Sequence, residues 1–436
     1  MTEPNRLHAP EIHRLGGMEL PPVGRMRLVN GVELVTLDHG RQPVNRLTVS
    51  WPVGTADADC PDALRLLRLM LCEGAGTRSG ADIAELFEFN GAWIKVETGR
   101  HVTSVTLHSL NKSVGEVLPV IGDLITAPTF PADTFLKIRE KEASACALRR
   151  SKVEQKCAEL SNIQCFGRGN PLALAQTPES LRGVEKERLD DVHRRLVLGT
   201  MPTVYLAGAL DDRLLAQVEA VIGRIGFGMA TAPVVRKVIT APVKATGERD
   251  VTLDENSMQT AIKIALPTVN RHHPDYELLR YTVFALGGYF GSRLMANIRE
   301  DKGYTYGISA SLASMPEGAF AGISCQADNS FAQAVIDETE KEINRLASEP
   351  MTDDELEIVR STAISGLTTM LDSPFSIMDY HQILDMYGLP PTYYAHQLEV
   401  LQSLSPEMIT ECAAKHLADA PRLVALAGNP SAGQMG

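Results

Sequence analysis

Apolar and polar positions along this chain follow two periods, which together predict a mixture of strands and helices. In residues 100–110 (RHVTSVTLHSL) and 304–312 (YTYGISASL) they alternate with a period near two, which is typical of half-buried strands. Residues 62–72 and 184–198 instead carry apolar residues at the spacing of a buried or amphipathic helix. The chain is therefore predicted to belong to the α+β class.

The same pattern occurs twice in the same order. Residues 184–208 and 404–428 both indicate an amphipathic helix followed by an apolar strand that ends in Leu-Ala-Gly. Residues 113–141 and 330–362 both indicate two helices separated by a proline, and a third, weaker pair joins residues 77–91 to residues 292–303. Three ordered matches are hard to attribute to chance, so the chain is interpreted as an internal duplication.

The duplication predicts two tandem homologous domains, each a mostly antiparallel sheet with flanking helices. We place the first domain at residues 1–228 and the second at residues 251–436. The segment between them, residues 229–250, is rich in Pro, Gly and Ala and is predicted to be a linker. In the second copy, Thr352 and Glu355 have the spacing of a capping box at a helix start.

Composition narrows the functional classes. The chain has 436 residues, of which 44% are apolar and 22% charged, values typical of a globular protein. Its net charge of −12 argues against general nucleic-acid binding, and no apolar run is long enough to span a membrane. The seven cysteines form no CxxC pair and no signal-like segment is seen, so reduced thiols and a cytoplasmic location are expected, unless a signal was removed before this numbering begins.

Residues 266–312 resemble the second domain of the pitrilysin-like M16 (M16B) family of zinc metallopeptidases. The shared features are Gly287-Gly288, Ser292-Arg293-Leu294, Ile298-Arg299-Glu300, Lys302-Gly303 and Tyr306. Matches at residues 76–79 (GTRS), 90–92 (NGA), 127–130 (APTF) and 166–171 (FGRGNP) extend the resemblance over nearly the whole chain. The resemblance implies that these two domains form half of a clamshell around a peptide chamber.

The zinc motif of that family, His-x-x-Glu-His, is degenerate in this sequence. Aligned through the GTRS turn, the two histidines fall on Arg65 and Leu69 and the general-base glutamate falls on Arg68. An arginine is permanently charged and has no lone pair for a metal or a proton, so this chain is expected to bind no zinc. The resemblance matches the family's third ligand, a glutamate, to Glu142. Arg65 and Arg68 are interpreted either as surface arginines or as contacts to a partner or substrate.

Arg299 and Tyr306 are the candidate site residues that remain. Arg299 is predicted in the last turn of a helix that Gly303 ends, and Tyr306 on a strand, facing the same way as Tyr304 and Ile308 by period two. The resemblance implies that this pair hydrogen-bonds the substrate backbone and stabilises a tetrahedral intermediate, with Tyr304 as a weaker candidate. The alternative is that Arg299 interacts with the helix dipole and Tyr306 is a half-buried strand residue.

The resemblance and the missing ligands suggest half of an active site. The leading hypothesis is the non-zinc subunit of a heterodimeric M16 metallopeptidase, inactive alone, whose sister subunit carries His-x-x-Glu-His and the zinc. The peptide substrate is expected to add a strand to a sheet edge, and in this chain the corresponding strand, residues 93–98, is interpreted as vestigial. The alternatives are a non-enzymatic scaffold, like the core proteins of respiratory complexes, and a homodimeric peptide-binding protein.

Overall fold

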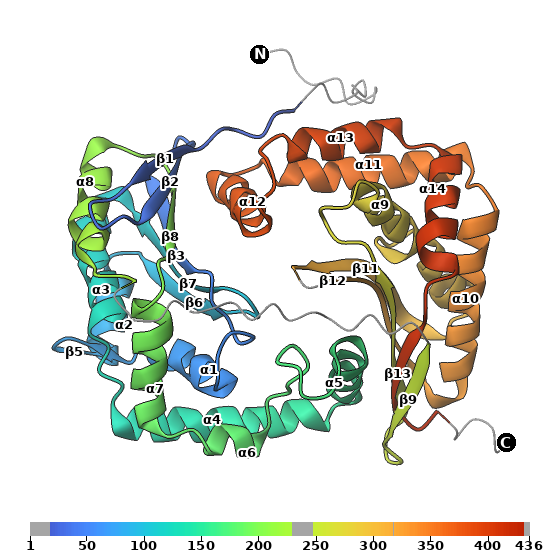
Figure 1. Ribbon diagram of the computed structural model, residues 1–436, viewed down its shortest axis with the longest axis horizontal. Coiled ribbons are helices and arrows are strands. Elements are labelled where there is room, and N and C mark those ends of the chain that lie inside the picture. Colours follow the sequence, from blue (N-terminus) through green and yellow to red (C-terminus); the bar gives the residue numbers. More distant parts are fainter. Residues whose placement is uncertain (1–17, 229–246, 317, 431–436) are drawn as a thin grey trace, which may run out of the picture.

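The computed structural model describes residues 18–228, 247–316 and 318–430 and contains two α+β domains that lie side by side (Figure 1). The helices of the first domain are α1 (Pro61–Met70), α2 (Gly80–Phe89), α3 (Val114–Thr126), α4 (Ala132–Ser151), α5 (Val153–Phe166), α6 (Pro178–Arg182), α7 (Lys186–Val192) and α8 (Asp212–Val221). Those of the second are α9 (Tyr276–Gly287), α10 (Ala332–Ser348), α11 (Asp353–Thr369), α12 (Pro374–Tyr387), α13 (Tyr393–Ser403) and α14 (Pro406–Ala413).

Each domain is built on one mostly antiparallel sheet. The first sheet has the order β1 (Gly24–Arg27), β2 (Glu33–Asp38), β8 (Thr203–Gly208), β3 (Val44–Trp51), β7 (Thr103–Leu110) and β6 (Trp93–Thr98). The second has the order β11 (Thr305–Met315), β12 (Gly318–Asp328), β10 (Gln259–Thr268), β13 (Leu423–Gly428) and β9 (Glu248–Leu253). The short strands β4 (Gly74–Ala75) and β5 (Arg78–Ser79) pair separately.

The two sheets have the same topology, which confirms the predicted duplication. The strands correspond in chain order as β2 with β9, β3 with β10, β6 with β11, β7 with β12 and β8 with β13. With this correspondence the order of strands across the two sheets is identical, and β1 is an additional strand at one edge. Each sheet also contains one parallel pair, β2 with β8 and β9 with β13. The predicted fold class, two tandem domains with mostly antiparallel sheets, is correct.

The repeated sequence segments fold alike. In both copies the helix before the last strand, α7 or α14, continues as a π-helical segment, His193–Leu198 or Ala414–Ala418, and then leads into β8 or β13. The predicted capping box at α11 forms in one direction only. The Thr352 hydroxyl accepts a hydrogen bond from the Glu355 amide, but the Glu355 carboxylate binds Arg293 instead of the N-cap amide.

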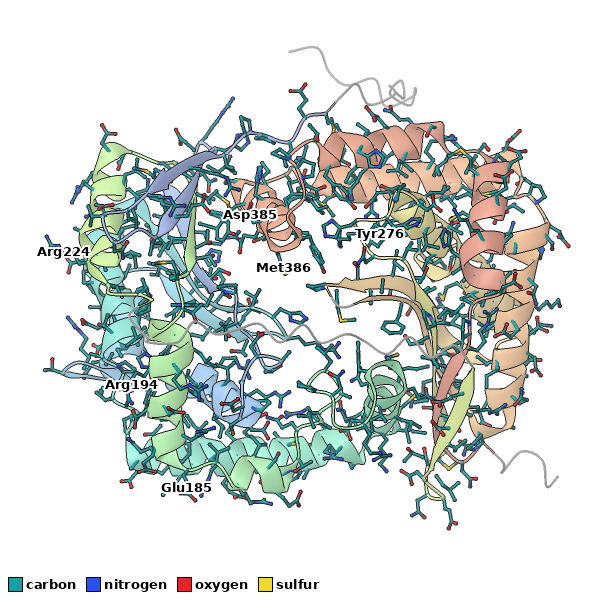
Figure 2. All side chains as sticks on the ribbon, in the orientation of Figure 1. Glu185, Arg194, Arg224, Tyr276, Asp385 and Met386 are labelled. Atoms are coloured by element: carbon teal, nitrogen blue, oxygen red, sulfur yellow. The ribbon has the colours of Figure 1, made fainter. Side chains whose placement is uncertain are left out.

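The two domains exchange equivalent helices. Helix α5, from the first domain, packs against β10 and β13 of the second, where the Cys157 thiol donates to the Ala425 carbonyl at 3.2 Å (Figure 1). Helix α12, from the second domain, packs against β8 of the first, and Asp385 on this helix points toward that sheet, where it accepts from the Tyr205 hydroxyl at 3.1 Å (Figure 2). This reciprocal exchange holds the two halves together.

The predicted linker extends too far. Residues 229–246 lie outside the described residues, but β9 begins at Glu248, so residues 248–250 are a strand of the second domain. The sequence placed the boundary late because residues 248–250 (ERD) are charged, whereas this edge strand leaves its side chains largely exposed.

All seven cysteines lie in the described residues, and none of them forms a disulfide. No helix in the described ranges is long and apolar enough to cross a bilayer.

Candidate functional site

Helix α1 carries the positions of the degenerate zinc motif and is held in place by its apolar face. Leu64, Leu66 and Leu67 are buried in the core of the first domain. Arg65 is partly buried and donates from Nη1 to Asp62 Oδ1 at 2.7 Å, and the other oxygen of Asp62 accepts from Ser180 at the start of α6. Asp62 therefore links α1 to α6, and Arg65 neutralises the carboxylate that makes this link, which neither of the two interpretations of this arginine had included.

The other two motif positions differ from Arg65. Leu69 is partly buried and packs against the first core. Arg68 lies in the last turn of α1, beside Val96 and Thr98 of β6, and makes no hydrogen bond or ion pair with any described residue. Its charge is favourable near a helix C-terminus, but it is otherwise uncompensated.

Glu142 does not act with these positions as a ligand set. It lies on α4, and its carboxylate accepts from Arg149 Nη2 at 2.7 Å. The neighbouring Cys146 donates its thiol to the Gln176 carbonyl, and burial raises the pKa of that thiol. In the described part of the chain no three His, Cys, Asp or Glu side chains are grouped as a metal site would require.

The segment between α9 and β11 is fixed at several points. A Cβ atom at Gly287, the last residue of α9, would lie 2.6 Å from Ala310, so glycine is required for the close packing of this helix end on β11. The guanidinium of Arg293 binds both oxygens of Glu355, at 2.7 and 3.1 Å. Asn297 donates to two glutamates of α10. Most residues of the sequence motif in this segment therefore have structural roles.

Arg299 lies at the end of this fixed segment, as predicted. It belongs to the π-helical segment Met295–Asp301, which ends where Gly303 adopts φ +65° and donates to the Arg299 carbonyl at 3.1 Å. Its side chain is one-third exposed, with Nε 3.4 Å from Glu300 Oε1. Its guanidinium carbon lies 4.7 Å from the centre of the Phe290 ring, a cation–π contact that restricts the arginine.

Tyr306 is oriented differently from the prediction. The expectation that Tyr304, Tyr306 and Ile308 share one face is wrong, because the pairing of β11 with β12 is irregular between Thr305 and Ile308. The Thr305 hydroxyl stabilises this bulge by donating to the Gln326 carbonyl and accepting from the Gly307 amide. Ile308 is buried, whereas Tyr306 is 94% exposed, so the alternative of a half-buried strand tyrosine is also wrong.

Tyr304 is a poorer candidate for a contact with substrate. Its ring is partly buried against the second core and stacks on Phe331, with ring centres 4.7 Å apart. Sequence reasoning missed Phe290, which is 65% exposed and contacts Arg299. The available signal was an aromatic pair, Tyr289 and Phe290, between Gly288 and Gly291.

Strand β6 is the free edge of the first sheet, since it pairs only with β7 within the described chain. Its exposed face carries Trp93, whose ring stacks on His108 of β7 at 3.7 Å, and His108 in turn contacts Phe375 of α12. Burial, and then the charge of Arg46, lower the pKa of His108 to about 4.

This lowered pKa predicts a loss of stability in acid. His108 stays neutral in the folded protein down to about pH 4, whereas in the unfolded chain it takes up a proton near pH 6.5. The unfolded state therefore binds more protons between these two pH values. The contribution of His108 to the stability of the folded protein is full above pH 6.5 and falls as the pH decreases toward 4. We expect the urea midpoint of the wild-type protein to fall more steeply over this range than that of His108→Gln. Equal slopes would contradict the assignment.

Comparisons with known proteins agree with this architecture. Residues 183–362 match the family model described as "Peptidase M16 inactive domain". An uncharacterized zinc protease of Mycobacterium tuberculosis is 25% identical over 338 residues, 75% of each chain, and a Helicobacter pylori protein named "non-peptidase homolog" is 21% identical over 358 residues, 81% of each. The crystal structure of a peptidase M16 inactive domain from Pseudomonas fluorescens has a TM-score of 0.83 at 22% identity, covering 93% of this chain and 98% of that one.

Proposed function

This chain is a member of the M16 peptidase family, and from that premise we propose that it is the non-zinc subunit of a heterodimeric zinc metallopeptidase. A sister subunit with the His-x-x-Glu-His motif would supply the metal and the general base. This chain would close the peptide chamber and contribute Arg299 and Tyr306. The observation that carries the proposal is the contrast between a cationic motif without metal ligands on α1 and an arginine of the second domain, Arg299, whose guanidinium contacts the Phe290 ring.

Zinc does not fit the residues at this chain's own motif. Arg65 is paired with Asp62, Arg68 would repel a dication, and Leu69 has no donor atom. The carboxylate of Glu142 is already bound to Arg149. No hydrolytic step is therefore assigned to this locus.

Arg299 and Tyr306 have the chemistry that the proposed role needs. Arg299 is permanently charged and has several donors, and Gly303 and Phe290 restrict its position. Tyr306 presents a phenolic hydroxyl on an exposed bulge. Donors that are fixed before the substrate binds stabilise negative charge developing on a peptide carbonyl oxygen without reorganising in the reaction.

The test is reconstitution. This chain and an M16 protein carrying His-x-x-Glu-His from the same genome are purified separately and mixed, and cleavage of a quenched fluorogenic peptide library is followed. We expect little cleavage by this chain alone and a mixed complex, isolated by size exclusion, that is at least about 10²-fold more active than the sum of its parts, since each half lacks groups the reaction needs. If the sister protein is as active alone as in the mixture, the proposal is wrong.

A second candidate is a scaffold or peptide-binding protein without enzymatic function. The Helicobacter pylori relative named as a non-peptidase homolog favours it. A stable assembly of this chain that contains no peptidase activity in any mixture would support this candidate over the first.

A further inference from the structure

A cavity of about 320 Å³ lies in the second domain, between helix α9, helix α11 and strand β11. Its wall is mostly apolar and includes Val283, Phe284 and Leu312, together with one arginine and three side chains that carry hydroxyl groups. A volume of a few hundred cubic ångströms and an apolar wall with a few polar groups are typical of ligand sites.

The internal duplication makes this cavity the counterpart of the degenerate zinc locus. Helix α9 corresponds to α1, because in each helix the second residue is an acid that pairs with an arginine three residues later. These pairs are Asp62 with Arg65 and Glu277 with Arg280. Each acid also accepts a hydrogen bond from a hydroxyl group of a later helix, α6 or α13. By this correspondence the three motif positions of α1 fall on Arg280, Val283 and Phe284, and all three line the cavity.

Strand β11 gives the cavity an unpaired main-chain edge. It is the last strand of the second sheet, corresponds to β6, and pairs only with β12 in the described chain. Residues 310–312 of β11 form one side of the cavity, and α11 forms another. The free N–H and C=O groups of an edge strand accept a further strand, in which every second side chain points to the same face. Side chains on the face of Ala310 would therefore point toward the cavity.

The charge of the wall selects a neutral side chain. Among the described residues that line the cavity, Arg280 is the only charged one. Its Nε donates to Glu277 Oε2 at 2.8 Å and its Nη2 donates to the Tyr281 hydroxyl, so its charge is already compensated. A second charge would enter the cavity without a partner, which is costly, whereas an apolar side chain is stabilised by leaving water.

We propose that this cavity binds an apolar side chain, such as leucine, of an extended peptide that pairs with the free edge of β11. That the ligand is a peptide rests on the proposed function. Tyr306 lies on the same strand, four residues before Ala310, or about 13 Å in extended chain. A peptide along β11 would therefore extend from the cavity toward the exposed Tyr306, and this chain would bind substrate without its sister subunit.

Gly366 allows the cavity to be filled without disturbing the fold. It lies within α11 and lines the cavity, and a Cβ atom added there would meet no atom within 4 Å. Replacing a glycine inside a helix also favours the helix. We expect Gly366→Leu to fold and to block the cavity. The matched control is Ser365→Leu, which adds the same side chain at the neighbouring position, outside the cavity wall.

The measurement is the fluorescence anisotropy of a short fluorescein-labelled peptide, with one central leucine, titrated with the isolated chain. Replacing that leucine by alanine should raise Kd by about tenfold, and replacing it by aspartate should abolish binding. Gly366→Leu should raise the Kd of the leucine peptide by about tenfold or more, whereas Ser365→Leu should leave it unchanged. Equal Kd values for the leucine and alanine peptides, or an unchanged Kd in a Gly366→Leu variant with normal thermal unfolding, overturn the proposal.

N-methylated peptides test the pairing with β11. Only every second amide of an added strand faces β11, so methylating one alternate set of amides should abolish binding and methylating the other set should not. Equal binding of the two methylated peptides would contradict the pairing. Because these titrations use the isolated chain, their outcome is independent of reconstitution. Binding at the cavity without any gain of activity in the mixture would uphold this inference and refute the proposed function.

Discussion

Replacing Arg299 by alanine is expected to lower kcat/KM of the reconstituted enzyme by about 10²–10³-fold, the usual loss when one fixed donor to a developing oxyanion is removed. The Gly303 amide binds the Arg299 carbonyl at the helix end, and the guanidinium carbon lies 4.7 Å from the centre of the Phe290 ring, so the side chain is oriented before a substrate binds. The loss should appear mainly in kcat, because the interaction strengthens in the transition state. Steady-state cleavage of one fluorogenic peptide by the mixed complex measures it.

Graded variants make this result specific. Arg299→Lys keeps the charge but loses the fork of donors, so its activity should fall between those of wild type and Arg299→Ala. Tyr306→Phe should lose less, because it removes a single neutral donor. Arg345→Ala, an exposed arginine on α10, is the control and should retain full activity. Size exclusion must show intact complexes throughout; unchanged kcat/KM in Arg299→Ala would show that the assigned role is wrong.

The largest effect on stability is expected from Glu277→Ala in the second domain. Glu277 is 2% exposed, binds Arg280 at 2.8 Å and accepts a hydrogen bond from the Tyr393 hydroxyl. Removing the carboxylate leaves a mostly buried guanidinium and a buried phenol without their partner. Because breaking a buried pair is much more costly than breaking a surface pair, the free energy of unfolding should fall by about 3 kcal/mol. Urea titration of the isolated chain measures it.

Glu349→Ala is the matched control for this prediction. Glu349 also pairs with an arginine close in sequence, Arg345, but both side chains are more than half exposed. Its loss should change the free energy of unfolding by less than about 0.5 kcal/mol. If the two variants were equally stable, the Glu277 contacts could not be a major support of helix α9, which leads into the loop that carries Phe290.

The fold was largely predictable because its signal is repeated. The segments ending at Gly208 and Gly428 share their apolar pattern, and a pattern that occurs twice is a stronger constraint than either copy alone. The predicted order of strands and helices is local information, and it was correct for β7, β8, β11 and β13. What the pattern could not give was the exchange of α5 and α12, because a helix shows which face is apolar but not which domain covers it.

The candidate site was less predictable. Periodicity placed Tyr306 and Ile308 on one face, but a bulge held by the Thr305 side chain inserts a residue and reverses the outcome. The contact of Phe290 with Arg299 joins a loop to a helix end, and no spacing rule links those positions. The roles of Arg299 and Tyr306 in catalysis stay predictions.

The amino-acid sequence by itself determined the duplicated α+β plan, the absence of histidine at Arg65 and Leu69 and the absence of a glutamate at Arg68, since residue identity and periodicity are properties of the chain. Only the tertiary structure decided that Arg65 is neutralised by Asp62, whereas Arg68 has no ion-pair partner among the described residues and lies beside Val96 and Thr98 of β6. The physical reason is that charge compensation and solvation depend on which groups meet in space, and those groups come from segments far apart in the chain.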